Sequence, residues 1–160
     1  MEAVPRACHV KATRVTADID AGRLGVVVEM DITDSQLDEQ PCSYDNYKLS
    51  IFDDGQLICE AEGEIDSDIF EMSVPLPMEN MTLWSPDSPQ LYQYTLQILD
   101  GDQGEEFVVD SISGYFGMRK IEMRTVGKFN RFFLNNKLLP FQLGLLDQGF
   151  WPDGQAPTML

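Results

Sequence analysis

The sequence has few basic residues, a single histidine and no long apolar run. Eleven Lys and Arg stand against 27 Asp and Glu, which gives a formal net charge of −16. Nucleic acids and anionic membranes both demand a basic face, so we expect neither as a partner. No apolar stretch approaches the ~20 residues of a transmembrane helix, and the first residues lack the regions of a signal peptide. The compartment stays open: cytoplasm or, with an upstream signal, periplasm or export.

Residues that build metal and redox sites are also scarce. Cys8, Cys42 and Cys59 are far apart and form no C-x-x-C pair, so a zinc site is not expected. Buried free thiols are the expected state, and one disulfide stays open. Asp18 and Asp20 are interpreted as turn residues rather than as a calcium site. We therefore expect neither a metal nor a cofactor.

Alternation of apolar and polar residues is what the sequence does contain. With 160 residues and 43% hydrophobic residues, the chain is long enough for one domain with a real core. Inward faces of period two are expected over 10–19, 26–32, 47–51, 57–61, 70–76, 92–98 and a last strand over 106–112. Asp53-Asp54-Gly55 predicts one hairpin turn between them. About seven antiparallel strands with regular turns predict an all-β, immunoglobulin-like sandwich.

A proline-bearing loop interrupts this pattern over 78–90. Pro86 and Pro89 cannot donate to a strand ladder, so we expect a structured loop that crosses from one sheet to the other. Tyr92 begins the next strand, where sandwich domains place a corner tyrosine. Trp84, inside the loop, is expected to be buried between the loop and a sheet.

The last third of the chain, 114–154, has a different organisation. An extended segment runs to Glu122, and a hairpin follows over 132–139 with Asn135 and Asn136 as its turn. An apolar strand over 140–146 then enters a polar, aromatic loop over 147–154. Barrel enzymes place substrate contacts at strand ends of this kind.

Three segments resemble one enzyme family: LWSPDSPQLYQYTLQI, GYFGMRKIE and FFLNNKLLPFQLGLLDQGFWPDG. They are similar to the region of family 2 glycoside hydrolases that joins the immunoglobulin-like domain to the catalytic barrel. That family includes β-galactosidases, β-glucuronidases and β-mannosidases. Two positions depart from the pattern. Asn136 stands where the family usually has Gly, and Asn still tolerates the turn. Leu143 stands where it often has Arg.

The resemblance implies a domain division and a function. It divides the chain into a sandwich, 1–122, and a segment, 123–160, that holds the hairpin and the first strand and loop of a truncated (β/α)8 barrel. The full-length protein would hydrolyse O-glycosidic bonds of β-glycosides with retention, using two glutamates that lie beyond residue 160. This chain alone would be a non-catalytic scaffold and linker without a catalytic residue. Its partners would be the family's jelly-roll and barrel domains and, in the full-length enzyme, a carbohydrate substrate.

The resemblance also implies roles for single residues. Asp147, Gln148 and Trp151, in the loop after the apolar strand, become candidate substrate contacts. Arg119 is expected to make a structural ion pair or a domain contact rather than a substrate contact. Trp84 is interpreted as a core residue rather than as a platform for a sugar ring, and Tyr92 as the corner tyrosine.

An alternative from another functional class stays open. The chain could be a free-standing sandwich that binds carbohydrate or protein, with the C-terminal segment as its own tail. A self-sufficient domain rarely ends in an uncovered apolar strand, because an open edge pairs with other chains, and this favours the enzyme-derived scaffold. We expect residues 140–152 to pack on their own sandwich or on a second copy of the chain, which would make a homo-oligomer.

Overall fold

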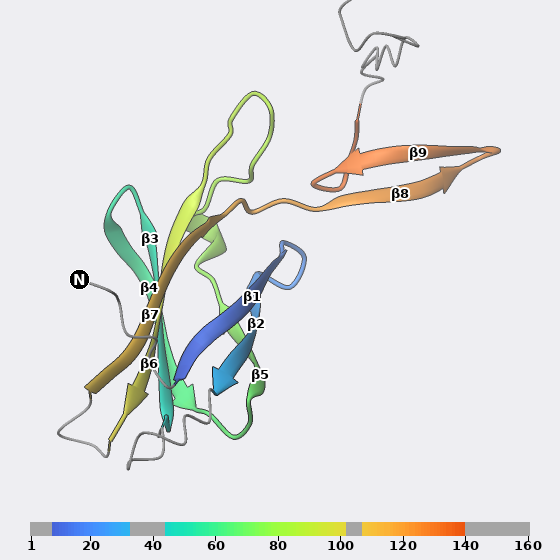
Figure 1. Cartoon of the computed structure of the whole chain (residues 1–160). Helices are drawn as coiled ribbons and strands as arrows, with labels where there is room; N and C mark the ends of the chain where they lie inside the picture. The colour runs from blue at the N-terminus through green and yellow to red at the C-terminus, as the bar shows by residue number, and fades with distance from the viewer. Residues whose placement is uncertain (1–7, 33–43, 102–106, 140–160) are drawn as a thin grey trace, which may run out of the picture.

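A computed structural model describes residues 8–32, 44–101 and 107–139 (Figure 1). The described part is almost entirely β-structure. Its strands are β1 (Cys8–Asp18), β2 (Arg23–Ile32), β3 (Asn46–Asp53), β4 (Gln56–Glu64), β5 (Ile69–Pro75), β6 (Tyr92–Asp100), β7 (Phe107–Phe116), β8 (Ile121–Val126), β9 (Phe129–Leu134) and β10 (Lys137–Leu138). A short 3-10 turn, η1 (Met78–Asn80), follows β5. No helix in these described ranges is long and apolar enough to cross a bilayer.

The first seven strands form two antiparallel sheets that face each other. One sheet has the order β1-β2-β5, and the other has the order β4-β3-β6-β7. The chain therefore changes sheet between β2 and β3, between β4 and β5, and again between β5 and β6. The last change uses the proline-bearing loop, as expected. This arrangement confirms the all-β, immunoglobulin-like sandwich.

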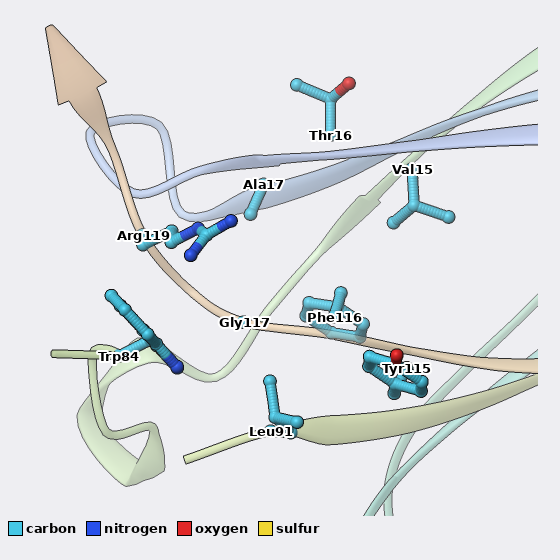
Figure 2. Close-up of a pocket in the computed structure, with 9 residues that line it drawn as sticks. All are labelled: Val15, Thr16, Ala17, Trp84, Leu91, Tyr115, Phe116, Gly117 and Arg119. Atoms are coloured by element: carbon cyan, nitrogen blue, oxygen red, sulfur yellow. The ribbon is translucent and has the colours of Figure 1, made fainter. Parts of the chain in front are cut away.

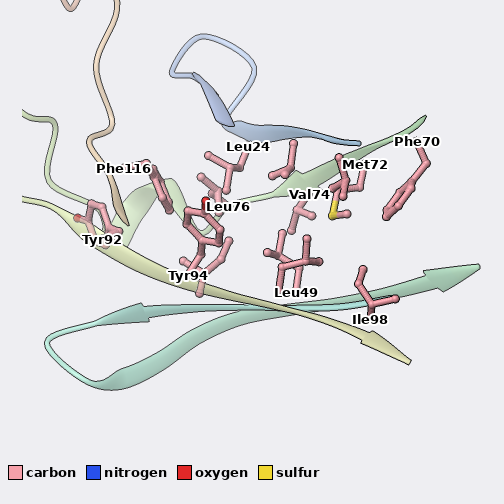
Figure 3. Close-up of a cluster of buried hydrophobic side chains, with 14 of the residues drawn as sticks. Leu24, Leu49, Phe70, Met72, Val74, Leu76, Tyr92, Tyr94, Ile98 and Phe116 are labelled. Atoms are coloured by element: carbon pink, nitrogen blue, oxygen red, sulfur yellow. The ribbon is translucent and has the colours of Figure 1, made fainter. Parts of the chain in front are cut away.

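Apolar side chains from both sheets meet between the layers (Figure 3). The expected inward faces supply most of this core: Val26, Val28 and Met30; Leu49 and Ile51; Phe70, Met72, Val74 and Leu76; Tyr92, Tyr94, Leu96 and Ile98. Leu24, two residues before the expected face, also belongs to it. Phe116 and Met118 close one end. Alternation succeeds as a predictor here because each strand buries one face and exposes the other.

One inward face was predicted wrongly at its end. Leu57 was expected to face inward with Cys59 and Ala61, but it is exposed. The cause is a register shift in the β3–β4 ladder: Ile51 pairs with Cys59, and the next residue, Phe52, pairs with Leu57. The bulge inserts Ile58 as an extra residue and moves Leu57 to the other side of the strand. The predicted hairpin turn is confirmed, with positive φ at Asp54 and Gly55.

Two tyrosines of the core lie across glycines of the neighbouring strand. Tyr94 pairs with Gly114, and Tyr47 pairs with Gly63. A Cβ atom added to Gly114 would lie 2.6 Å from the Tyr94 ring, and one added to Gly63 would lie 2.6 Å from the Tyr47 hydroxyl oxygen. Both glycines are therefore required by the space that a tyrosine ring occupies, rather than by a turn.

Tyr92 makes the corner expected of it. Its hydroxyl oxygen accepts a hydrogen bond from the Thr82 amide nitrogen at 2.7 Å, ten residues earlier in the crossing loop. Its ring is buried and packs against Phe116, with ring centroids 5.8 Å apart. The corner thus ties the crossing loop to the first residue of β6.

The cysteines depart from the expected free thiols at one position. Cys8 is buried and its sulfur is disulfide-bonded. Cys59 is a free, half-buried thiol, and burial raises its pKa. Cys42 lies outside the described residues. Sequence spacing left this disulfide open because it does not show which strand ends come together in space.

A second small sheet, which we call the arm, projects from the sandwich (Figure 1). It consists of β8, β9 and β10 in the order β10-β9-β8. The expected turn at Asn135 and Asn136 joins β9 to β10, and both residues have positive φ. The hairpin between β8 and β9, which turns at Gly127, was not predicted. Since β8 begins at Ile121, the arm starts two residues before residue 123, where the second segment was expected to begin. The division itself stays a proposal.

Candidate functional site at the junction of sandwich and arm

The candidate substrate contacts lie outside the described residues. This applies to Asp147, Gln148 and Trp151, so their role stays a prediction. The three candidates for structural contacts lie in the described part, and two of them, Trp84 and Arg119, come together where the arm leaves the sandwich. The candidate site within the described residues is therefore the junction between the sandwich and the arm.

Trp84 and Arg119 stack on each other at this junction (Figure 2). The guanidinium carbon of Arg119 lies 4.7 Å from the centre of the indole ring. Residues 117–120 leave the sheet after β7, and Gly117 therefore lies against the same tryptophan. A Cβ atom added to Gly117 would lie 3.2 Å from the Trp84 Cβ, which is a tight contact. The Trp84 amide nitrogen also donates to the Met118 carbonyl oxygen at 2.9 Å.

These contacts correct two expectations. Trp84 is only half-buried and is not part of the core between the sheets. Arg119 is exposed, and of the two expected contacts, an ion pair or a domain contact, the described ranges show a cation–π stack on Trp84 and no ion pair; the domain contact stays a prediction. The reason is shared: the segment that carries Arg119 runs beside the crossing loop, so the arginine covers the indole face that a core position would have buried.

A groove of about 490 Å³ lies beside this stack. Trp84 and Arg119 line one part of it, and Val15, Ala17 and Leu91 line other parts. Tyr115 also lines the groove and is 72% exposed. Figure 2 shows these side chains around the point where the chain passes Gly117.

Asp20 connects the sandwich to the arm by charge. This residue lies in the turn between β1 and β2, and its carboxylate accepts a hydrogen bond from the Lys120 ammonium group. It also accepts one from the Asn136 side-chain amide at 2.6 Å. The bond from Lys120, and then that from Asn136, lowers the pKa of Asp20. The same bond raises the pKa of Lys120. Asp18, which was considered together with Asp20 as a calcium site, accepts hydrogen bonds from the backbone amides of Asp20 and Ala21. These bonds are those of a turn residue.

Asn135 connects three segments at once. Its side-chain nitrogen donates to the Trp84 carbonyl oxygen at 2.9 Å, and its side-chain oxygen accepts from the Lys120 amide at 3.0 Å. Its own amide nitrogen donates to the Lys120 carbonyl oxygen at 2.8 Å. The left-handed backbone at this position, with φ 51°, is one that Asn tolerates. The turn residue therefore joins the arm, the crossing loop and the chain between β7 and β8.

A further pair extends the network along the arm. The Arg124 guanidinium donates to the Glu122 carboxylate and, at 2.6 Å, to the Asn136 side-chain oxygen. The Lys120 ammonium also lies 3.6 Å from the other Glu122 oxygen. The acids of the junction are thus engaged by cations and amides, which suits a structural contact between two bodies better than proton transfer.

The sequence did not predict the residues that fix the arm to the sandwich, which we call the anchor: Asp20, Lys120, Asn135 and Asn136. Asp20, Lys120 and Asn135 were seen as turn or strand residues, and Asn136 as a departure from a family pattern. Two successive asparagines in a tight turn are a local signal, because their side chains can bond to nearby backbone. Their partners, however, lie up to 116 residues away, beyond the reach of local patterns.

Comparison with known structures supports the fold. A β-glucuronidase from Ruminococcus gnavus in complex with C6-substituted uronic isofagomine is 22% identical, with a TM-score of 0.53. The match covers 82% of this chain and 19% of that protein. The Parabacteroides merdae β-glucuronidase is 20% identical, with a TM-score of 0.56, over 83% of this chain and 16% of that protein. This chain therefore spans less than a fifth of their length.

The sequence also matches the model of one enzyme family. A search of curated proteins returned no match. The model of the glycosyl hydrolases family 2, in contrast, matches residues 8–119, which run from the first residue of β1 to the arginine that stacks on Trp84. That span includes both sheets, the crossing loop and the tyrosine corner. The chain belongs to family 2 of the glycosyl hydrolases.

Proposed function

We propose that this chain is the non-catalytic sandwich of a family 2 glycoside hydrolase, and that it works as a scaffold that holds the arm in a fixed direction. The observation that carries the proposal is the junction, where Asp20 and Asn135 join the arm to two separate loops of the sandwich. In the full-length enzyme the chain would lie between a jelly-roll domain and the catalytic barrel. That enzyme would hydrolyse O-glycosidic bonds of β-glycosides with retention, in carbohydrate metabolism.

Two acids of the described part, Asp20 and Glu60, are held in a way that does not suit a general acid. Retaining hydrolysis needs two carboxyl groups about 5–5.5 Å apart, one of which stays protonated to act as the acid. The Asp20 carboxylate is held by Lys120, and the Glu60 carboxylate is held by Ser50 and Lys48. Both contacts lower the pKa of the carboxyl group, which is the opposite of what a general acid needs. The catalytic pair is therefore proposed to lie in the barrel, and Asp147, Gln148 and Trp151 stay candidate substrate contacts.

An activity assay tests this proposal. The purified 160-residue chain should release no aryl alcohol from aryl β-galactoside, β-glucuronide or β-mannoside. A matched positive control is a family 2 β-glucuronidase at the same molar concentration. Turnover of any of the three substrates that co-purifies with the folded chain through a second column would contradict the proposal.

The groove beside Trp84 favours a free-standing binding module. Tyr115 and Leu91 are exposed there, and exposed aromatic rings stack on sugar rings. The Arg119 guanidinium, however, occupies one indole face, so Trp84 offers less platform than an open ring. Quenching of tryptophan fluorescence by methyl β-glycosides, lost in Tyr115→Ala, would support the module. An unchanged spectrum would favour the scaffold.

A further inference from the structure

The outer face of the four-stranded sheet carries side chains that line up across its strands. Gln93 and Thr95 alternate with buried residues of β6 and so point away from the core. Residues that pair in an antiparallel ladder lie side by side on one face of the sheet. Gln93 pairs with Phe52 of β3 on one side and with Tyr115 of β7 on the other. Two residues further along β6, Thr95 pairs with Ser113, so a row of two aromatic rings and an amide stands beside a pair of hydroxyl groups.

These five residues, together with Leu91, line a hollow of about 620 Å³ on the outer face of the sheet. Depressions that hold small molecules measure about 300–1,000 Å³. Tyr115 is 72% exposed, so its ring forms an open wall of the hollow. Leu91 and Tyr115 also line the groove beside Trp84 (Figure 2), but the polar residues of the hollow do not. The hollow is therefore a second candidate site with polar groups of its own.

The polar side chains of the hollow have no partner within the described part of the protein. Neither the side-chain amide of Gln93 nor the hydroxyl groups of Thr95 and Ser113 make a hydrogen bond there. Gln93 and Ser113 are exposed, and Thr95 is half-buried. Ser50, which pairs with Thr95 from the other side, instead donates to the Glu60 carboxylate at 2.8 Å. The hollow thus offers one amide and two hydroxyl groups whose hydrogen bonds are available to a ligand.

The hollow is also uncharged, although the chain as a whole carries a formal net charge of −16. Among the described residues that line it, none is acidic or basic. A phosphate would find no cation there, and a metal ion would find no carboxylate, so neither suits the hollow. A wholly apolar ligand would cover the Gln93 amide without giving it a hydrogen bond, which is costly. The lining therefore fits a neutral ligand that has both hydroxyl groups and an apolar face.

A neutral sugar in its ring form has this combination. The C–H groups of the ring make an apolar face that stacks on an aromatic side chain, and the hydroxyl groups at its edge exchange hydrogen bonds with amides and hydroxyls. Neighbouring strands lie about 4.8 Å apart, so Phe52 and Tyr115, two strands apart, leave about 10 Å between their backbones. A disaccharide that lies across the strands spans this distance.

We propose that the outer face of the sheet β4-β3-β6-β7 carries a binding site for a neutral oligosaccharide. One sugar ring stacks on Tyr115, and the hydroxyl groups of the sugar bond to Gln93, Thr95 and Ser113. The scaffold function does not require such a ligand, so the proposal goes beyond it and does not depend on it. Trp84 does not line the hollow, and its fluorescence therefore does not report on this site.

Amide chemical shifts measured by nuclear magnetic resonance on the 160-residue chain test the site. The probes are three neutral disaccharides: cellobiose, lactose and β-1,4-mannobiose. At least one of them should move the amide signals of Gln93, Ser113 and Tyr115 along a saturable curve. The signals of β2, in the other sheet, should stay in place and report that the sandwich is folded in every variant.

Substitutions separate a built site from general contact with the sheet. Tyr115→Ala should raise the Kd about tenfold, because the stacking platform is lost, whereas Tyr115→Phe keeps the ring and should keep the affinity. Gln93→Ala should raise the Kd about three- to tenfold through the lost hydrogen bonds. Gln97→Ala is the matched control, since it makes the same change in the same strand and on the same face but outside the hollow. It should leave the Kd unchanged.

Four results would overturn the proposal. One is the absence of saturable shifts with all three disaccharides. Another is an equal Kd for Gln93→Ala and Gln97→Ala. Shifts confined to Ala17 and Arg119 would place the sugar in the groove beside Trp84 instead. Tighter binding of methyl β-glucuronide than of methyl β-glucoside would contradict an uncharged site. None of these results bears on the anchor of the arm, so the scaffold function stands or falls separately.

Discussion

The Asp20 carboxylate and the Lys120 ammonium group form an ion pair although 100 residues separate them in the sequence. Asp20 belongs to the turn between the first two strands of the sandwich, and Lys120 immediately precedes the arm. The same carboxylate also accepts a hydrogen bond from Asn136, in the turn between β9 and β10. One side chain of the sandwich thus bonds to the residues that immediately precede the two outer strands of the arm, β8 and β10.

Removing that carboxylate should loosen the arm without unfolding the sandwich. In Asp20→Asn the amides of Lys120 and Asn135 should exchange faster, because the ion pair that holds their segments together is lost. Amides of β2, such as that of Val26, should keep their protection. Equal exchange at the junction in both proteins would show that the arm does not depend on Asp20.

Acid should have the same effect as the substitution. Contacts with Lys120 and Asn136 lower the pKa of Asp20 below its ordinary value of 3.8. The stability that Asp20 contributes is therefore fully present above that value and is lost as the pH falls through the lower, folded value. Exchange at the Asn135 amide, corrected for the intrinsic rate, should be flat from neutral pH to pH ~5 and should rise only in stronger acid. A rise between pH 7 and 5 would implicate another group.

Asn135 should matter more than its neighbour Asn136. Both have positive φ, which glycine adopts readily, so a glycine at either position keeps the turn. Asn135→Gly leaves the Trp84 carbonyl and the Lys120 amide without their partner, and should cost about 1–2 kcal/mol in a denaturant melt. Asn136→Gly is the matched control, since its side-chain bonds are exposed and glycine is common there in the family. Equal losses would show that the turn, and not the side chain, fixes the arm.

Gly114→Ala should destabilise the sandwich although alanine is the smallest change available. The added methyl group would lie 2.6 Å from the buried Tyr94 ring, so the ring or the strand must move, at a cost of about 1–3 kcal/mol. Gly25→Ala serves as the control, because its Cβ would meet only the Thr16 carbonyl oxygen at an ordinary 3.7 Å. Urea melts that show the same midpoint for both variants would contradict the role assigned to Tyr94.

Trp84→Ala should cost less than the loss of a core tryptophan. A fully buried Trp would forfeit about 3–5 kcal/mol, whereas a half-buried one that stacks under Arg119 should forfeit about 1–3 kcal/mol. Trp84→Phe keeps a ring beneath the guanidinium and should recover most of the loss. A loss for Trp84→Ala below ~0.5 kcal/mol would identify a surface residue and would favour a role for Trp84 as a platform for a sugar ring.

The contrast between these residues shows what the sequence could predict. The alternation around Val26 and Val28 predicts a strand with one buried face, because successive side chains of a strand point to opposite sides. Pro86 and Tyr92 predict a crossing loop and its corner from local chemistry. The outward turn of Leu57 depends on a bulge, and no residue type signals a bulge at Ile58.

The arm and its anchor were harder to predict for two physical reasons. Ile121 and Met123 are exposed on one face while Arg124 is exposed on the other, so β8 lacks the in-and-out pattern of a half-buried strand. The anchor depends on contacts such as that between Asp20 and Asn136, which are 116 residues apart and are brought together by the tertiary fold. The family resemblance predicted a hairpin over 132–139, but it did not predict the hydrogen bonds that join this hairpin to the sandwich.

The direction of the arm is the central claim of this account, and backbone relaxation measured by nuclear magnetic resonance tests it most directly. A chain of 18.1 kDa is small enough for this measurement. The account predicts order parameters of about 0.85 for the amides of β8 and β9, equal to those of β2 and β6. Residual dipolar couplings of the arm should also fit the alignment frame of the sandwich. Order parameters below about 0.6 in the arm, or couplings that need a separate frame, would contradict a rigid scaffold.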